Sequence, residues 1–227
     1  MDVMRELNDR RTSADIVFEA LYKQIVGLEL LPGTKMSEVE VAKRFDLSRQ
    51  PVRDAFSRLS NLGLLMVRPQ RSTIVRHFSL IAVRNARFIR TAIEVEVLRQ
   101  ACADRDVSYD DALRENLEMQ RKVIALNNAE AFHELDYEFH RLLCNAARAD
   151  FAFDVISSEK AQVDRLCMLS LTSKSAMEDL FQDHERIVDG LFESDAETAD
   201  TALRCHLERL TPIIKKIHET HRDFFEN

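Results

Sequence analysis

The feature of this sequence that most restricts its fold is the scarcity of glycine and proline after residue 79. From Leu80 onward the chain contains one glycine, Gly190, and one proline, Pro212. Because these two residue types interrupt helices and mark turns, a long region that nearly lacks them favours helices joined by short polar connections. The sequence therefore predicts an all-helical antiparallel bundle, and a mainly α protein overall.

Clusters of polar capping residues divide this region into six expected helices, along which apolar residues recur at helical spacing. Pro212 falls inside the last helix and is expected to kink or divide it, because proline lacks the amide hydrogen that a helix interior needs. The predicted helices span 80–104, 108–126, 129–147, 151–171, 174–194 and 196–224.

The first 79 residues follow a different pattern. A helix from Ser13 to about Glu29 is ended by the turn Leu31-Pro32-Gly33. Ser37 and Glu40 then form an S-x-x-E capping box, which predicts a second, short helix over SEVEVAKRF.

A third helix is expected to begin at Arg49, with Ser48 as its N-cap and the Ser48 hydroxyl accepting from the amide of Gln50. Its residues separate into two faces. Arg49 and Arg53 stand one turn apart on the polar face, while the apolar face consists of Val52, Ala55, Phe56 and Leu59. One side can pack while the other meets phosphates or bases, although an ordinary amphipathic surface helix has the same pattern.

Gly63 suits the left-handed position just past a helix end, and the apolar run from Leu64 to Val67 indicates a strand. Residues 68–72 then form a turn before a second strand. Two short helices, the second polar on one side, followed by a hairpin, predict a winged helix-turn-helix domain over residues 1–79.

The charge distribution supports this division. The whole chain has a net charge of −7, but residues 1–79 have a net charge of +3 and residues 80–227 a net charge of −10. Within residues 41–76 there are 8 basic residues against 2 acidic ones. A basic module joined to an acidic one indicates that only the N-terminal part contacts DNA.

No run of about 18 apolar residues is present, and the first residues are charged. We therefore expect no membrane segment and predict a cytoplasmic protein. The cysteines are widely separated and form no CxxC pair. They are expected to be buried free thiols.

The run from Ile25 to Val75 resembles the DNA-binding domain of GntR-family transcription regulators. The shared motifs are Leu31-Pro32-Gly33, Ser48-Arg49-x-Pro51-Val52-Arg53-x-Ala55, Leu59-x-x-x-Gly63-Leu64 and Pro69-x-Arg71. The resemblance implies that the recognition helix contacts double-stranded operator DNA and that the wing reaches the minor groove. The DNA-binding residues expected on this basis are Ser48, Arg49, Gln50, Arg53, Arg71 and Ser72. Ser72 departs from the family, which usually has glycine after the wing arginine.

In the second region, Asp136 and His140 stand four apart on one expected helix, and His184 and His206 lie on two others. One carboxylate and three imidazoles from facing helices form a ligand set for Zn, Ni, Fe or Mn that leaves coordination positions open. Taken singly, each histidine has the ordinary interpretation of a core or surface residue with a hydrogen-bond partner.

The segments FIRTAIEVEVL, ELDYEFHRLL, DHERIVDGL and CHLERL are similar to the FCD effector domain of the FadR branch of the GntR family. This resemblance implies that Asp136, His140, His184 and His206 bind a divalent metal and that Arg90 helps to hold a carboxylate effector. Arg165 is a second candidate anion contact. The second domain is thus expected over 80–227 as an effector-binding and dimerisation domain, and its six helices indicate the VanR-like subgroup.

Together these features predict a homodimeric DNA-binding regulator, and not an enzyme, whose operator affinity is controlled by a small organic acid bound at a metal site. Repression relieved by the effector is the commoner behaviour in the resembled family. Two alternatives remain open at this point: a metal-dependent enzyme acting on a small carboxylate, because an open metal position can activate water, and a regulator whose metal is purely structural.

Overall fold

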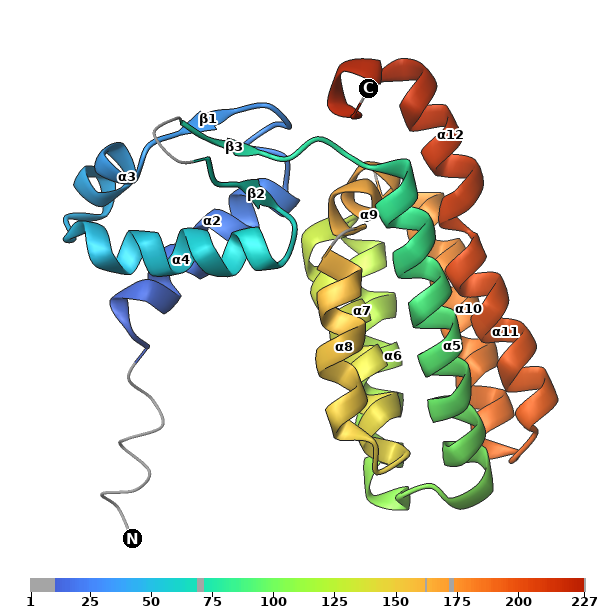
Figure 1. The fold of residues 1–227 in the computed structure, drawn as a ribbon. Helices are drawn as coiled ribbons and strands as arrows, with labels where there is room; N and C mark the ends of the chain where they lie inside the picture. The colour runs from blue at the N-terminus through green and yellow to red at the C-terminus, as the bar shows by residue number, and fades with distance from the viewer. Residues whose placement is uncertain (1–10, 69–71, 162, 172–173, 227) are drawn as a thin grey trace, which may run out of the picture. The chain divides into compact units, whose positions relative to one another are not determined.

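The structure is a computed structural model that describes residues 11–68, 72–161, 163–171 and 174–226. It divides the chain into two compact units (Figure 1). The first unit contains the residues up to Phe78 together with 224–226, and the second unit contains 79–223.

Short helices and a small sheet make up the first unit. The strand order is β1-β3-β2 with antiparallel pairing, in which Ile74 lies between Lys35 and Met66. The predicted winged helix-turn-helix is therefore observed, with one additional strand, β1. Its elements are α2 (Ser13–Val26), β1 (Lys35–Met36), α3 (Glu38–Phe45), α4 (Arg49–Asn61), β2 (Leu65–Met66) and β3 (Thr73–Val75).

The core of this unit lies where α2 packs against α4. The apolar side chains in this contact are almost completely buried, and burial of each large aliphatic or aromatic side chain contributes about 1.5 to 3 kcal/mol. Gly63 takes the left-handed conformation with φ of 71°, which turns the chain from α4 into β2 as predicted. The residues in this contact are Val17, Leu21, Ile25, Val52, Ala55, Phe56 and Leu59.

Two capping predictions are wrong. Ser37 and Ser48 do occupy N-cap positions with extended backbone, but neither side chain makes a capping hydrogen bond. Because Ser48 is exposed, water can satisfy the first-turn amides of α4 in its place. The capping box of this unit is instead at the start of α2, where Thr12 and Asp15 bond to each other reciprocally.

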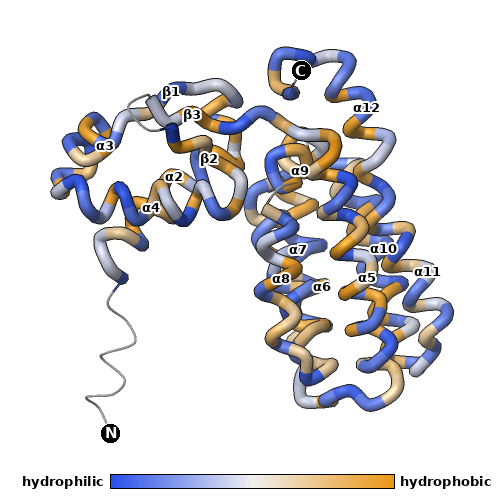
Figure 2. The backbone as a smooth tube through the Cα atoms, viewed as in Figure 1, coloured by the Kyte–Doolittle hydropathy of each residue, from blue (hydrophilic) through white to orange (hydrophobic). Residues whose placement is uncertain are grey.

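The second unit is an antiparallel helical bundle in its described residues. Figure 2 shows hydrophobic and hydrophilic positions alternating along its helices, as expected when one face of each helix is buried. Its elements are α5 (Leu80–Asp104), η1 (Val107–Tyr109), α6 (Asp110–Ala125), α7 (Ala129–Ala146), α8 (Asp150–Ala161), α9 (Asp164–Ser170), α10 (Lys174–Phe192), α11 (Ala196–Glu208), α12 (Leu210–Thr220) and η2 (Arg222–Phe224).

The prediction of six bundle helices is wrong. The segment predicted as one helix over 151–171 contains both α8 and α9, and the segment predicted over 196–224 is divided between α11 and α12. The second division has a clear cause, since Pro212 lies in the first turn of α12, where its missing amide hydrogen costs no helical bond. The prediction of the VanR-like subgroup depended on six bundle helices and is therefore no longer supported by the helix count.

Helices α10 and α11 approach closely at Gly190. A Cβ atom at Gly190 would lie 2.8 Å from the backbone nitrogen of Ala199 and 3.0 Å from its Cβ. Both residues are completely or nearly completely buried in the bundle core. The single glycine of the bundle therefore marks a packing contact between helices and no turn.

The described cysteines form no disulfide. Cys102 and Cys144 are buried, as predicted, whereas Cys167 is half-buried and Cys205 is exposed. The expectation of four buried thiols is therefore only partly correct.

Residues 224–226 belong to the first unit because they pair with Phe78. The Phe78 amide donates to the Phe224 carbonyl at 2.7 Å, and the Glu226 amide donates to the Phe78 carbonyl at 2.8 Å. The rings of Phe78 and Phe225 are both buried, with centroids 5.2 Å apart. The sequence interpretation had placed these residues with the bundle.

Candidate functional site

The first candidate site is the exposed face of α4. Arg49 and Arg53 project from it, outside the buried face of the same helix, and each remains more than half exposed. Both guanidinium groups pair with Glu38 of α3, whose Oε2 lies 3.1 Å from Arg49 and 3.4 Å from Arg53. Burial alone would raise the pKa of Glu38, but the two arginines outweigh it and lower the pKa below its ordinary value.

The other predicted DNA-binding residues lie around this face or on the wing. Ser48 and Gln50 are exposed at the start of α4, where Gln50 donates to Asp54 at 2.8 Å. Ser72 is exposed just before β3, and Arg71 falls outside the described residues. The structure thus brings Ser48, Arg49, Gln50 and Arg53 together on one helix.

The second candidate site lies inside the bundle, where α7, α10 and α11 bring four predicted ligands together. Asp136, His140, His184 and His206 each offer one ligand atom, and these atoms lie within 4.8 Å of one another. All four residues are buried. Residues up to 70 positions apart in the chain therefore meet at one interior point, as the sequence predicts.

Asp136 stands at the centre of this group. Its Oδ1 atom lies 3.3 Å from His184 Nε2, 3.8 Å from His140 Nε2 and 4.0 Å from His206 Nε2. The three imidazole rings face each other across the site, with centroids between 4.6 and 6.1 Å apart. The arrangement presents several nitrogen atoms to one carboxylate oxygen.

Neighbouring polar side chains contact the Nδ1 atoms of two of the imidazole rings and so orient them. His140 Nδ1 faces Glu94 Oε2 at 2.6 Å, and His184 Nδ1 lies 2.8 Å from Gln120 Oε1. Gln120 is itself held by Asn116 at 2.6 Å. An acceptor at Nδ1 favours a proton there and leaves Nε2 free to accept, which is how metal-binding histidines are usually oriented.

Burial sets the protonation of the site. It lowers the pKa of His184 below its ordinary value, and burial together with the other two imidazoles lowers that of His206 well below it. Burial alone would raise the pKa of Asp136, yet Lys160 and the histidines hold it well below its ordinary value. Neutral imidazoles with an ionised carboxylate are the forms that bind cations.

This donor set fits a divalent metal ion. Metal–nitrogen bonds of about 2.0 to 2.1 Å place neighbouring ligand atoms roughly 3 to 4 Å apart, which is close to the separations here. His206 Nδ1 is also buried without a hydrogen-bond partner among the described residues. Because burying an unpartnered polar atom is costly, this atom supports the binding of a further group here. Four protein ligands would leave positions open on a six-coordinate metal.

A cavity of about 330 Å³ adjoins the cluster and is lined by Arg90, Asp136 and His206 among other residues. Arg90 is buried on α5, where its Nε donates to Glu94 at 2.7 Å and its Nη2 lies 3.4 Å from His140 Nε2. Arg165 is buried on α9, but it is not among the described residues that line this cavity. The structure therefore places Arg90 in the wall of this cavity, beside the cluster.

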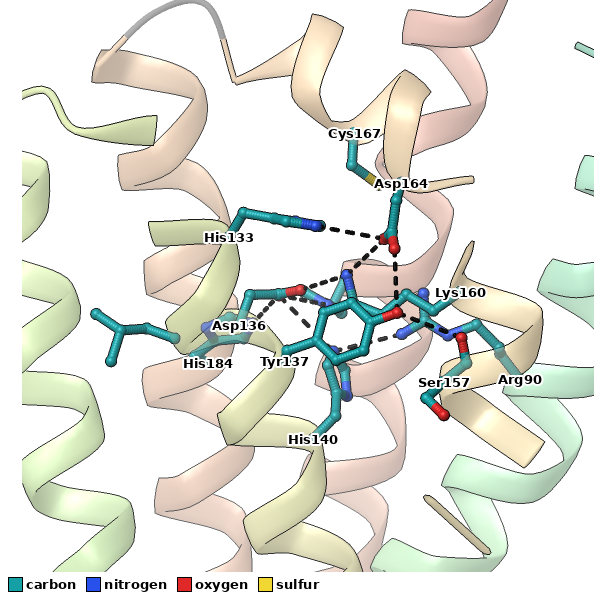
Figure 3. Close-up of polar contacts among 12 residues, drawn as sticks. Arg90, His133, Asp136, Tyr137, His140, Ser157, Lys160, Asp164, Cys167 and His184 are labelled. Atoms are coloured by element: carbon teal, nitrogen blue, oxygen red, sulfur yellow. Dashed lines mark hydrogen bonds and ion pairs between the residues drawn. The ribbon is translucent and has the colours of Figure 1, made fainter. Parts of the chain in front are cut away.

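The sequence analysis missed a buried lysine next to the cluster (Figure 3). Lys160 Nζ lies 2.8 Å from Asp136 Oδ2 and 3.2 Å from Asp164 Oδ1. Burial alone would lower the pKa of Lys160, but the two carboxylates outweigh it and raise the pKa. Lys160 and Asp164 stand four apart, and this spacing indicates a possible ion pair but does not show that the pair is buried.

His133 also lines the cavity. Its side chain is nearly buried and its Nε2 atom lies 3.6 Å from Asp164 Oδ1. Burial lowers its pKa below the ordinary value.

Over the described part of the chain, no helix combines the length and apolar character needed to cross a bilayer. Two family models match. Residues 13–75 match the bacterial regulatory proteins of the gntR family, and residues 86–209 match the FCD domain.

Similar proteins cover nearly the whole chain. The HTH-type transcriptional repressor RspR of Escherichia coli K12 is 37% identical over 225 residues, which are 99% of each chain. A transcriptional regulator from an unstable DNA locus of Streptomyces ambofaciens is 31% identical over 98% of this chain and 93% of its own.

Solved structures show the same fold. Escherichia coli McbR/YncC has a TM-score of 0.79 at 16% identity over 92% of this chain and all of its own. A GntR regulator from Rhodococcus sp. RHA1 has a TM-score of 0.75 at 20% identity, covering 89% of this chain and 97% of its own.

The relatives are transcription regulators and not enzymes, which removes the alternative of a metal-dependent enzyme. The family models divide the chain as its two structural units do, with the gntR match in the first and the FCD match in the second. This protein is a DNA-binding transcription regulator that belongs to the GntR family and carries an FCD domain.

Proposed function

We propose that this regulator places α4 in the major groove of double-stranded operator DNA and that Arg49 and Arg53 contact the DNA. The supporting observation is that these two guanidinium groups are exposed one turn apart on α4, outside its buried face. Phosphate contacts from such side chains give affinity, and base contacts give specificity.

To test this proposal, DNA that the full chain binds is first selected from a random library. The affinity of each variant for the selected DNA is then measured. Arg49→Ala should weaken binding about tenfold or more, since one good base contact is worth about 1 to 3 kcal/mol. Arg58→Ala is the matched control, because Arg58 is on the same helix but pairs with Asp15 on α2. Equal affinities of the Arg49 and Arg58 variants would contradict the assignment.

We further propose that the protein is a homodimer whose two copies join through α5 and α8. These helices pack against each other, and both expose large apolar side chains. Phe88 on α5 is 74% exposed and Phe151 on α8 is 75% exposed. Ile81 stands seven residues before Phe88 and Val155 four residues after Phe151, so each exposed pair shares one face of its helix. Large exposed apolar side chains gathered on one face support an interaction surface. A two-fold dimer would match a palindromic operator.

Sedimentation of the full chain tests the dimer. Phe88→Glu should convert it to a monomer, because a carboxylate would be buried without a partner. Leu126→Glu is the control, since Leu126 is 77% exposed but lies after α6. A dimer that survives Phe88→Glu and Phe151→Glu together would place the interface elsewhere.

In the second unit, Asp136, His140, His184 and His206 would hold one divalent metal ion, with Zn, Ni, Fe and Mn as the candidates. When bound, the ion would supply a Lewis-acid position for a carboxylate. His184→Ala should remove most of the metal found by elemental analysis, whereas His221→Ala, at an exposed histidine, should not. Full occupancy in the His184 variant would exclude this residue from the site.

The effector would be a small organic acid bound in the cavity beside the cluster, where Arg90 orients its carboxylate. Arg165 stays a weaker candidate because it does not line that cavity. A thermal-shift panel of carboxylates on the metal-loaded protein tests this, since a ligand of the folded state raises its stability. If the metal raises the melting temperature and no carboxylate adds to it, the metal is purely structural.

We infer that effector binding relieves repression. RspR is named a repressor, which supports the proposal that the present protein also represses transcription when it is bound to DNA. The effector would favour one arrangement of the two recognition helices, and this requires a higher affinity for that arrangement. A protein that binds operator DNA acts where the chromosome is, which supports a cytoplasmic location. An effector that tightened operator binding would reverse the proposed sign.

A further inference from the structure

Lys160 contacts a candidate metal ligand without belonging to the ligand set. Its side chain extends from α8 and is 1% exposed, so its ammonium group is inside the bundle. Figure 3 shows it between Asp136 and Asp164. The Nζ atom lies 2.8 Å from Asp136 Oδ2 and 3.2 Å from Asp164 Oδ1. A cation beside a site for a divalent cation opposes metal binding by charge alone, so its position calls for a separate explanation.

The two oxygens of Asp136 have different partners. Oδ1 faces the three histidines at 3.3 to 4.0 Å, whereas Oδ2 is paired with Lys160. An oxygen that accepts a charge-assisted hydrogen bond has less electron density to offer a metal. Lys160 therefore directs Asp136 to present one oxygen to the cluster.

Lys160 is itself held in place independently of Asp136. Asp164 is completely buried and accepts from the Tyr137 hydroxyl at 3.0 Å through Oδ2, while its Oδ1 faces the ammonium group. The Lys160 Nζ atom also lies 4.5 Å from the centre of the Tyr137 ring. Tyr137 on α7 and Asp164 on α9 thus hold the ammonium group in place. One of its N–H groups remains available to donate to Asp136.

We propose that Lys160 is a positioning residue that keeps Asp136 a one-oxygen ligand, so that a six-coordinate metal held here would retain two open positions for a carboxylate. The inference rests on the proposed metal site. Without Lys160, Asp136 could turn its second oxygen to the metal and occupy one of those positions. Lys160 would then determine how a carboxylate effector binds, and not whether the metal does.

The test uses the full chain loaded with Co²⁺, whose visible absorption reports its coordination number. The probes are oxalate, which needs two adjacent positions, and acetate, which needs one. In Lys160→Met the metal content should stay at the native level and the cobalt spectrum should change before any probe is added. Oxalate affinity should fall at least tenfold more than acetate affinity, and Lys160→Arg should restore much of the difference. Lys174→Met, at an exposed lysine on α10, is the control.

Each outcome is decisive. An unchanged cobalt spectrum with equal losses for both probes would show that Lys160 contributes only charge, and would overturn the proposal. If Lys160→Met does not fold, Asp164→Asn keeps the lysine but loosens its support, and should produce the same spectral change to a smaller degree. An unchanged spectrum in Asp164→Asn would then overturn it. A native protein that binds no Co²⁺ would instead remove the proposed metal site itself.

Discussion

Arg49 and Glu38 join the first residues of α4 and α3, with the Arg49 Nη2 atom 3.1 Å from Glu38 Oε2. Arg53 shares the same oxygen, so one carboxylate orders the two cations that we assign to DNA contact. The arginines are more than half exposed, and pairs of this kind contribute at most about 1 kcal/mol. The arginines can therefore exchange Glu38 for phosphates at little cost.

Glu38→Gln should consequently strengthen binding to non-operator DNA by about threefold, because it removes a negative charge next to the proposed phosphate contacts. Fluorescence anisotropy at several salt concentrations measures this. Glu40→Gln is the control, since it removes the same charge from α3 and Glu40 has no ion pair with either arginine. Unchanged or weaker non-specific binding would show that Glu38 contributes chiefly by ordering the arginines.

Glu94 supports both Arg90 and His140, so its charge bears on the proposed metal site. Glu94→Gln keeps an acceptor of the same shape but loses the negative charge that faces His140 Nδ1 at 2.6 Å. Loss of such a supporting partner typically lowers metal affinity by about 10- to 100-fold. Competition with a chromophoric chelator measures the affinity, with Glu96→Gln, exposed on the same helix, as control. Native metal affinity in the Glu94 variant would mean that His140 needs no oriented partner.

The metal-free protein should lose stability as the pH falls below about 6.5. His184 and His206 have pKa values below the ordinary 6.5, because they are buried. From 6.5 down to those lower values the unfolded chain takes up protons that the folded chain does not, so the free energy of unfolding decreases. Above 6.5 both states hold neutral imidazoles and this contribution is constant.

Urea unfolding at about pH 7.5 and about pH 5.5 checks this dependence. His206→Asn should reduce the difference between the two midpoints, because one of the buried imidazoles is gone. Added metal should steepen the dependence, since protons and metal compete for the same nitrogens. A midpoint that does not change over this range would contradict the neutral, buried state of the two histidines.

Gly190→Ala should destabilise the bundle by about 1 to 3 kcal/mol, the usual cost of inserting an atom into a packed core. The new Cβ would meet the Ala199 backbone nitrogen at 2.8 Å, and the backbone has less freedom to yield than a side chain. The urea midpoint measures the loss. The double change Gly190→Ala with Ala199→Gly should recover part of it, by removing the Cβ at 3.0 Å. An unaltered midpoint for Gly190→Ala would show that α10 and α11 can separate without cost.

The sequence allowed the fold class to be predicted because glycine, proline and apolar spacing are local signals. The start of α4 at Arg49 and the left-handed Gly63 follow from such signals. The division between α11 and α12 does not follow from Pro212 alone, because a proline can either kink a continuous helix or divide it. Capping by Ser37 and Ser48 failed because a hydroxyl at the right position can bond to water as easily as to an amide.

The candidate metal ligands were predicted because the spacing of Asp136 and His140 and the family resemblance identify them together. Lys160, Asp164 and Gln120 were not, because each depends on which helices become neighbours. A lysine in a sequence is most often on the surface, and only the packing of α8 against α7 buries this one. The side chains that orient a site are thus harder to predict than the site.

The pairing of Phe78 with residues 224–226 makes the bundle, in topological terms, an insertion within the DNA-binding unit. The chain leaves that unit after Phe78 and re-enters it at Phe224, so α5 and η2 are both covalent connections to it. Under the proposed function, a conformational change in α5 or α12 would be transmitted to the DNA-binding unit through two covalent connections that are hydrogen-bonded to each other at Phe78.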